Sequence, residues 1–88
     1  MRYAVVTGVT KGIGRAVAER LLQRDFFVIG NYASVDSAAK AFLQDNEKYA
    51  QRLLVLKHEL SSYETACVFA ERIMSVSQTI DVLILNND

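Results

Sequence analysis

Several features that define other classes of protein are missing from this chain of 88 residues. It has one cysteine, so no disulfide can form within it, and we expect a reducing, cytoplasmic environment. Ten basic and ten acidic residues cancel, which leaves no basic field for nucleic acid. There is no signal-peptide pattern and no apolar run as long as a membrane span. We therefore predict neither a nucleic-acid partner nor a membrane partner.

Glycine is also scarce, but three of the four glycines fall in one stretch, Thr7–Gly14, with the sequence TGVTKGIG. An apolar run the size of a buried strand, Tyr3–Val6, precedes it, and a helical pattern follows it to about Arg24. A strand, a glycine-rich turn and a helix in this order form a phosphate site, because a helix N-terminus presents unpaired N–H groups and partial positive charge. The spacing GxxxGxG differs from the common GxGxxG fingerprint, and the P-loop pattern does not fit. Taken alone, such a glycine-rich stretch can also be an ordinary turn that binds no ligand.

The rest of the chain alternates continuous apolar runs with amphipathic segments. The apolar runs predict strands at residues 3–7, 26–30, 53–56 and 80–85, and the periodic segments predict helices at 12–24, 36–46 and 61–76. We expect Asp36 to cap the second helix, and Ser61 with Glu64 to form a capping box on the third. The apolar residues expected to face inward are Ile13, Ala16, Val17, Leu21, Leu22, Ala38, Ala39, Phe42, Leu43, Ala66, Phe69, Ala70 and Ile73.

This β-α-β-α-β-α-β order predicts an α/β fold with a parallel sheet and right-handed crossovers. The expected strand order is 3-2-1-4, which is part of a Rossmann-type doubly wound sheet. The reversal between strands one and four opens a crevice at their carboxyl ends, and ligands bind at such switch points. Both the glycine-rich loop and the pair Asn86-Asn87 fall at this crevice.

Three motifs together resemble the short-chain dehydrogenase/reductase family. Thr7–Gly14 matches TGxxxGIG, Glu59-Leu60 stands where the family has an Asp-hydrophobic pair, and Asn86-Asn87 matches the first half of NNAG. The resemblance covers the whole chain and is to members of the 3-oxoacyl-[acyl-carrier-protein] reductase type. It implies that residues 1–88 are the N-terminal half of a dinucleotide-binding domain, a fragment of a longer single-domain chain. It also implies a homo-oligomer and a small-molecule or acyl-carrier-bound carbonyl substrate.

The resemblance further implies which residues bind the nicotinamide dinucleotide. Glu59 accepts a hydrogen bond from the adenine amino group, the Leu60 main chain contacts the adenine edge, and Asn87 lies beside the ribose. Glu59 is one methylene longer than the usual Asp, and Asp88 replaces the usual Ala. The loop residues implied to hold the phosphates and ribose are Gly8, Thr10, Lys11, Gly12 and Ile13.

The end of the second predicted strand favours NADP(H) over NAD(H). An NAD site places a carboxylate there for the ribose hydroxyls, whereas this chain has Asn31 and Tyr32. A carboxylate would repel a 2′-phosphate, while the Lys11 ammonium and the Ser34 hydroxyl can bind one. We therefore predict Lys11, Asn31 and Ser34 at the cofactor. The alternatives are a solvated loop lysine at Lys11 and a cap or turn residue at Ser34.

The family's catalytic pattern, a Tyr followed four residues later by Lys with a Ser upstream, transfers the substrate proton during hydride transfer. None of the four tyrosines has a lysine at that spacing. We therefore predict no catalytic residue, no metal site at the isolated His58, and no activity for the 88 residues alone. Two functions stay open. One is the NADP(H)-binding part of an oxidoreductase that transfers a hydride between the cofactor and a carbonyl or alcohol substrate, and the other is a non-catalytic nucleotide-binding module.

Overall fold

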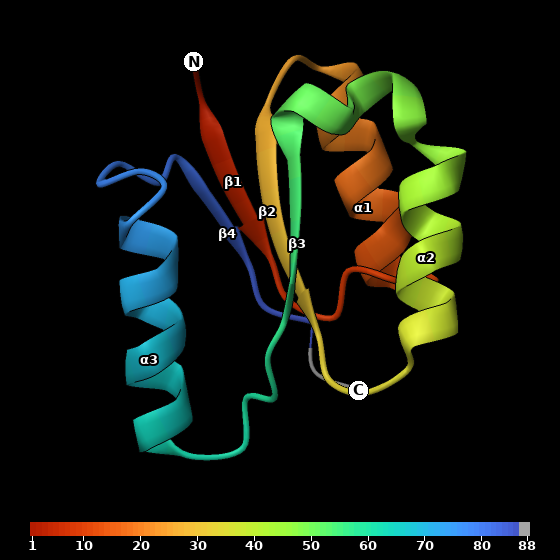
Figure 1. Ribbon diagram of the computed structural model, residues 1–88. Coiled ribbons are helices and arrows are strands. Elements are labelled where there is room, and N and C mark those ends of the chain that lie inside the picture. Colours follow the sequence, from red (N-terminus) through yellow and green to blue (C-terminus); the bar gives the residue numbers. More distant parts are fainter. Residues whose placement is uncertain (87–88) are drawn as a thin grey trace.

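The computed structural model describes residues 1–86, which form a four-stranded parallel sheet with helices on both faces (Figure 1). The strand order β3-β2-β1-β4 confirms the predicted topology. The strands are β1 (Tyr3–Val6), β2 (Phe27–Tyr32), β3 (Leu53–Lys57) and β4 (Val82–Ile84), and the helices are α1 (Gly12–Gln23), α2 (Asp36–Asp45), the 3₁₀ helix η1 (Glu47–Arg52) and α3 (Tyr63–Met74).

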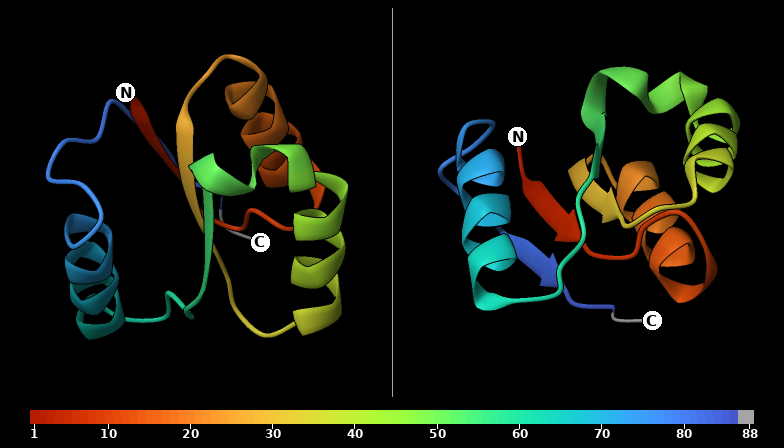
Figure 2. Two further views of the ribbon diagram at one scale, coloured as in Figure 1. Left: turned by 45° about the horizontal axis from the view of Figure 1, so that its top comes forward. Right: turned by 60° about the horizontal axis from the view of Figure 1, so that its bottom comes forward.

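The sheet separates two hydrophobic cores. Helices α1 and α2 cover one face and α3 covers the other (Figures 1 and 2). Neighbouring residues of a strand point to opposite faces, so Ala4 and Val28 pack toward α1 and α2, while Val5 and Ile29 pack toward α3. The continuous apolar runs are thus explained by burial on both faces. The first core contains Ala4, Val6, Val9, Ala18, Leu22, Phe26, Val28, Phe42 and Leu53, and the second contains Val5, Ile29, Phe69 and Ile73.

Some apolar side chains predicted to face the core lie outside it. Ile13 is 74% exposed and Leu43 is 42% exposed. Ala16 on α1, and Ala66 and Ala70 on α3, are also exposed. The prediction was wrong for these residues because each helix packs against only one face of the sheet. The side of the helix that is buried is therefore narrower than the side that carries apolar residues. In α3 the buried residues are Phe69 and Ile73.

Helix α3 begins one residue later than predicted. Ser62, not Ser61, is the N-cap, and its hydroxyl accepts a hydrogen bond from the Thr65 N–H at 3.1 Å. The Thr65 hydroxyl in turn accepts a hydrogen bond from the Ser62 N–H at 3.0 Å. The threonine hydroxyl therefore completes the capping box that Glu64 was expected to complete.

Strand β2 extends two residues beyond its predicted end. Asn31 and Tyr32 pair with Leu56 and Lys57 of β3, so they belong to the sheet and not to the following loop. Asp36 is the first residue of α2, not its cap, and its carboxylate bonds to other side chains. The apolar pattern missed this extension because Asn31 is polar but buried.

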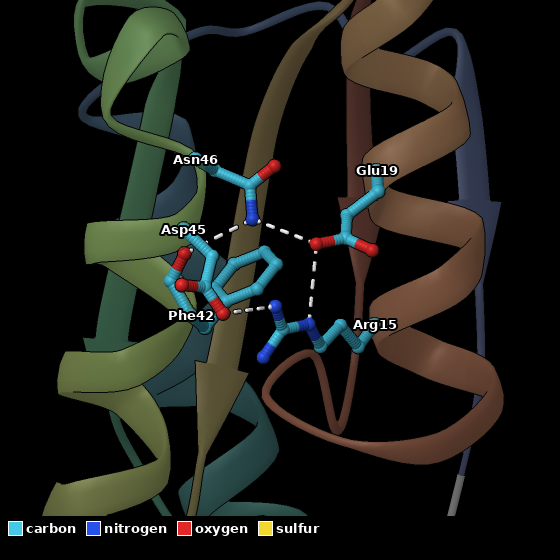
Figure 3. A network of polar contacts seen from close by, with 5 residues as sticks. All are labelled: Arg15, Glu19, Phe42, Asp45 and Asn46. Carbon is cyan, nitrogen blue, oxygen red and sulfur yellow. Dashed lines mark hydrogen bonds and ion pairs between the residues drawn. The ribbon is translucent and has the colours of Figure 1, made fainter.

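A polar network joins α1 to α2 on their shared flank (Figure 3). The Arg15 guanidinium donates to Glu19 at 3.1 Å and to Asp45 at 2.7 Å, and the bond to Asp45 raises the pKa of Arg15. The Asn46 amide donates to Glu19 at 2.8 Å and to the Phe42 carbonyl at 3.0 Å. The buried Phe42 ring lies beneath the Arg15 guanidinium. This network fixes the beginning of α1 relative to the end of α2.

Candidate dinucleotide-binding site

A pocket of about 350 Å³ lies at the carboxyl ends of the strands. All four strands supply part of its wall through the residues at or just after their ends, as expected for the switch point of such a sheet. The lining residues are Thr7, Gly8, Thr10, Lys11, Asn31, Tyr32, Ala33, Ser34, Val35, Glu59, Leu60 and Asn86.

Helix α1 begins beside this pocket. Its N-cap is Lys11, whose side chain makes no capping hydrogen bond, and the first turn carries no acidic residue. The first main-chain bond of the helix is from Arg15 N–H to the Lys11 carbonyl, at 3.3 Å. Gly12 has φ +62°, and a Cβ built there would have no atom from outside its own turn of the helix and its chain neighbours within 4 Å. The early N–H groups and the open space beside Gly12 therefore suit an anion.

Glycine is needed at Gly14 for a different reason. A Cβ there would overlap the Gly8 carbonyl oxygen and would lie 2.6 Å from the Asn86 amide nitrogen. The close contact of Gly14 is thus with the loop after β1 and with Asn86, and only a residue without a Cβ fits there. Gly8 has φ +63°, a backbone conformation that disfavours residues with a Cβ.

Asn31 connects three parts of the pocket wall. Its side-chain oxygen accepts a hydrogen bond from the Gly8 N–H at 3.0 Å, and its amide donates to the His58 carbonyl at 2.8 Å. Its main-chain carbonyl accepts a hydrogen bond from the Val9 N–H at 3.0 Å. Asn31 is 5% exposed. Its side chain therefore orders the loop after β1 against the segment after β3.

Asn86 connects β4 to the same loop. Its N–H donates to the Thr7 hydroxyl at 2.7 Å, and its amide donates to the Gly8 carbonyl at 3.3 Å. The Thr7 hydroxyl donates in turn to the Asn86 carbonyl at 3.4 Å. Asn86 therefore ties the segment after β4 to the loop after β1.

His58 supports the wall formed by Glu59 and Leu60. Its N–H donates to the Tyr32 carbonyl at 2.9 Å. Its Nε2 lies 2.7 Å from the Thr65 carbonyl, so this nitrogen must donate, and its Nδ1 lies 3.1 Å from the Arg72 guanidinium, so it must accept. The ring thus carries its proton on Nε2 and links the pocket wall to α3, which assigns His58 a structural role.

Tyr32, Asp36 and Lys57 form a second polar group behind the turn that lines the pocket. The Tyr32 hydroxyl donates to Asp36 Oδ1 at 2.9 Å, and Lys57 Nζ lies 3.1 Å from Oδ1 and 3.2 Å from Oδ2. The hydrogen bond from Tyr32, followed by that from Lys57, lowers the pKa of Asp36. The same bond raises the pKa of Tyr32. Asp36 is therefore an ionised, fully partnered carboxylate.

The structure brings most of the predicted binding residues to one pocket. Gly12 and Ile13 form the first turn of α1 and are not part of the lining, and Asn87 lies outside the described residues. The sequence did not indicate that Ala33 and Val35 would also line the pocket. The predicted residues in the lining are Gly8, Thr10, Lys11, Asn31, Ser34, Glu59 and Leu60.

The described residues lack both a metal site and a membrane-spanning helix. Among residues 1–86, no three His, Cys, Asp or Glu side chains gather in a way that could hold a metal ion. Across the same part of the chain, no helix has the length and apolarity needed to cross a membrane.

Comparison with known proteins gives consistent matches over nearly the whole chain. The chain is 34% identical over 85 residues to acetoacetyl-CoA reductase from Rhizobium meliloti. This alignment covers 97% of the present chain and 33% of that protein. A Bacillus thuringiensis structure assigned as a 3-oxoacyl-reductase matches 99% of this chain and 36% of its own, with TM-score 0.90 and 30% identity. A metagenomic short-chain oxidoreductase in complex with NADP matches 93% of this chain and 37% of its own, with TM-score 0.81 and 26% identity.

The chain spans about one third of the length of these relatives. The family model for short chain dehydrogenases matches residues 2–87. The pocket at the ends of parallel strands, the glycine-rich loop and the helix N-terminus beside it are features of dinucleotide-binding folds. The chain therefore belongs to the short-chain dehydrogenase family of oxidoreductases.

Proposed function

We propose that this chain binds NADP(H), in preference to NAD(H), as the cofactor-binding part of a carbonyl reductase or alcohol dehydrogenase. One observation carries the proposal. The uncapped N-terminus of α1 and the open space beside Gly12 adjoin a pocket that also contains the ends of β2 and β3. Such a pocket can accept a pyrophosphate at one side and a nucleoside at the other.

The residues divide by chemistry into two groups. The N–H groups of Gly12 and Ile13 and the buried Thr10 would bind the phosphates, because they adjoin the positive end of α1. Glu59 and Leu60 would contact the adenine from the segment after β3. Asn87 would lie beside the ribose.

The preference for a 2′-phosphate rests on the turn after β2. Ser34 and Lys11 line the same pocket and are both exposed, so a hydroxyl and an ammonium are free to meet a phosphate. Asn31 would support this contact through the loop and not by contact with the phosphate, since both ends of its side chain are already bonded. The NADP complex of a related structure is consistent with this preference.

The bound cofactor would supply the hydride, while this chain would bind and orient the cofactor. The names of two matched proteins, acetoacetyl-CoA reductase and 3-oxoacyl-reductase, support a 3-oxoacyl thioester as the substrate class of the complete protein. We further propose that residues 1–88 are the N-terminal half of a dinucleotide-binding domain that works as a homo-oligomer.

A second candidate function is a non-catalytic nucleotide-binding module. It is favoured by the absence of any tyrosine with a lysine four residues later among the 88 residues. This module would bind NADPH but would turn over no carbonyl substrate. Turnover of an acetoacetyl thioester by the purified chain would eliminate it.

The deciding experiment is calorimetric titration of the chain with NADPH and with NADH. We expect both to bind, with NADPH tighter, and we expect Lys11→Glu to weaken NADPH more than NADH. Lys48→Glu is the matched control, because Lys48 lies on η1 at the opposite end of β3 (Figure 1). Failure of both cofactors to bind would disprove the proposed function, and tighter binding of NADH would disprove the preference.

A further inference from the structure

The turn of residues 33–35, which lines the pocket, is closed at its base by three side chains that we name the clasp: Tyr32, Asp36 and Lys57. Tyr32 ends β2 and Asp36 begins α2, so their hydrogen bond at 2.9 Å joins the two ends of the turn. Lys57 is the register partner of Tyr32 on β3, which brings its ammonium to the same carboxylate.

Asp36 is the one carboxylate among residues 31–36, which comprise the end of β2, the turn and the start of α2. In dinucleotide sites a carboxylate beyond this strand binds the ribose hydroxyls and repels a 2′-phosphate. Here both Asp36 oxygens already have partners, because Oδ1 bonds to Tyr32 and Lys57 and Oδ2 bonds to Lys57. Its charge is also matched by the Lys57 ammonium within 4 Å.

We propose that the clasp selects the cofactor. Lys57 and Tyr32 hold Asp36 away from the ribose and balance its charge, so that the pocket accepts a 2′-phosphate despite the nearby carboxylate. This inference rests on the proposed function. It adds Asp36, Tyr32 and Lys57 as positioning residues that set cofactor specificity without contacting the reacting atoms.

The expected effect is modest because the pair is exposed. The side chains of Lys57 and Asp36 are 55% and 67% exposed, so solvent and salt screen their interaction. An exposed charge next to a phosphate site changes affinity by about two- to fivefold. The effect should shrink as the salt concentration rises, since the Debye length falls to roughly 3 Å at 1 M salt.

The test is a double-mutant cycle on the full chain, with affinities for NADPH and NADH measured by calorimetry. Lys57→Met leaves the Asp36 charge unbalanced and should weaken NADPH about two- to fivefold while changing NADH little. Asp36→Asn frees the Lys57 ammonium and should shift the ratio toward NADPH. The double variant should return the ratio to that of the unmodified chain.

Two control variants make the same charge changes at the opposite end of the strands. Lys48→Met lies on η1, and Asp25→Asn lies before β2, where its φ of +68° suits asparagine equally well. Neither should change the ratio of the two affinities. The unfolding temperature of each variant is measured to separate loss of folding from loss of selectivity.

Four outcomes would contradict the clasp. Equal weakening of both cofactors by Lys57→Met would make the clasp a purely structural contact. Loss of NADH affinity in Asp36→Asn would show that Asp36 binds the ribose directly. Failure of the unmodified chain to bind either cofactor would overturn the proposed function and the clasp together, whereas unchanged ratios with intact binding would overturn the clasp alone.

Discussion

The side-chain oxygen of Asn31 accepts a hydrogen bond from the main-chain N–H of Gly8 at 3.0 Å. The same side chain donates to the His58 carbonyl at 2.8 Å, so one buried residue of β2 bonds to the segments that follow both neighbouring strands. Because Gly8 and Asn31 both line the pocket, this bond couples the shape of the glycine-rich loop to the end of the sheet.

Asn31→Ala should therefore reduce both stability and cofactor binding. It leaves the Gly8 N–H and the His58 carbonyl without partners, at a cost of about 1–3 kcal/mol in the free energy of unfolding. Urea denaturation measures this cost. Asn46→Ala is the matched control, because Asn46 is also 5% exposed and hydrogen-bonded but lies away from the pocket. Equal effects of the two variants on NADPH affinity would contradict the role given to Asn31.

Gly14→Ala and Gly12→Ala should both lower the free energy of unfolding, but for different physical reasons. At Gly14 a Cβ overlaps the Gly8 carbonyl, so the loop must move, and we expect a loss of about 1–3 kcal/mol. At Gly12 the space is open and only the positive φ is unfavourable, which costs about 1–2 kcal/mol.

Cofactor titration adds a second comparison between the glycine variants. The Cβ of Gly12→Ala enters the space proposed for the phosphates, so this variant should bind NADPH more weakly than its stability loss explains. If Gly14→Ala changed neither the free energy of unfolding nor NADPH affinity, the overlap with the Gly8 carbonyl would be easily relieved.

Tyr32 should ionise at higher pH than an ordinary tyrosine. Its hydroxyl donates to the Asp36 carboxylate, which raises the pKa of Tyr32 above the unfolded value of about 10. The stabilisation from this bond is present below that pH and is lost as the pH rises through the folded pKa. Ring-carbon NMR signals, assigned with Tyr32→Phe, measure the titration. Asp36→Asn should return the pKa of Tyr32 toward its ordinary value, and no change in that variant would contradict the hydrogen bond.

In the network between α1 and α2, the buried side chains should contribute more to the free energy of unfolding than the exposed ion pair. Phe42→Ala removes a fully buried ring and should cost about 3–5 kcal/mol. Asp45→Ala removes an ion pair whose carboxylate is 61% exposed, and it should cost less than about 1 kcal/mol. Thermal unfolding of the two variants checks this order. Comparable losses would mean that the ion pair contributes more than an exposed pair normally does.

The sequence was sufficient to predict the strand order and the position of the pocket. Four apolar runs separated by helical segments restrict the chain to a parallel sheet, and in such a sheet the strand ends meet at one edge. The glycine-rich loop and Asn86 were expected at that edge and are found there. These features depend on periodicity and topology, which are visible in the chain.

The clasp could not be predicted, because it depends on strand register. Tyr32 lies opposite Lys57 only because β2 continues through Asn31, a polar residue that ends the apolar pattern. The exposed position of Ile13 likewise depends on how α1 is rotated on the sheet. Register and rotation are set by contacts between distant residues, and these have no local signature in the sequence.

The bonds between Thr7 and Asn86 have a consequence for the kinetics of folding. The two residues are 79 positions apart, yet the loop beside β1 depends on both of them. Contacts of such long sequence separation form late, because the chain must first lose the entropy of closing the intervening loop. The glycine-rich loop should therefore acquire its final conformation only when β4 docks. During synthesis the first strand would leave the ribosome long before the segment that completes the loop beside it.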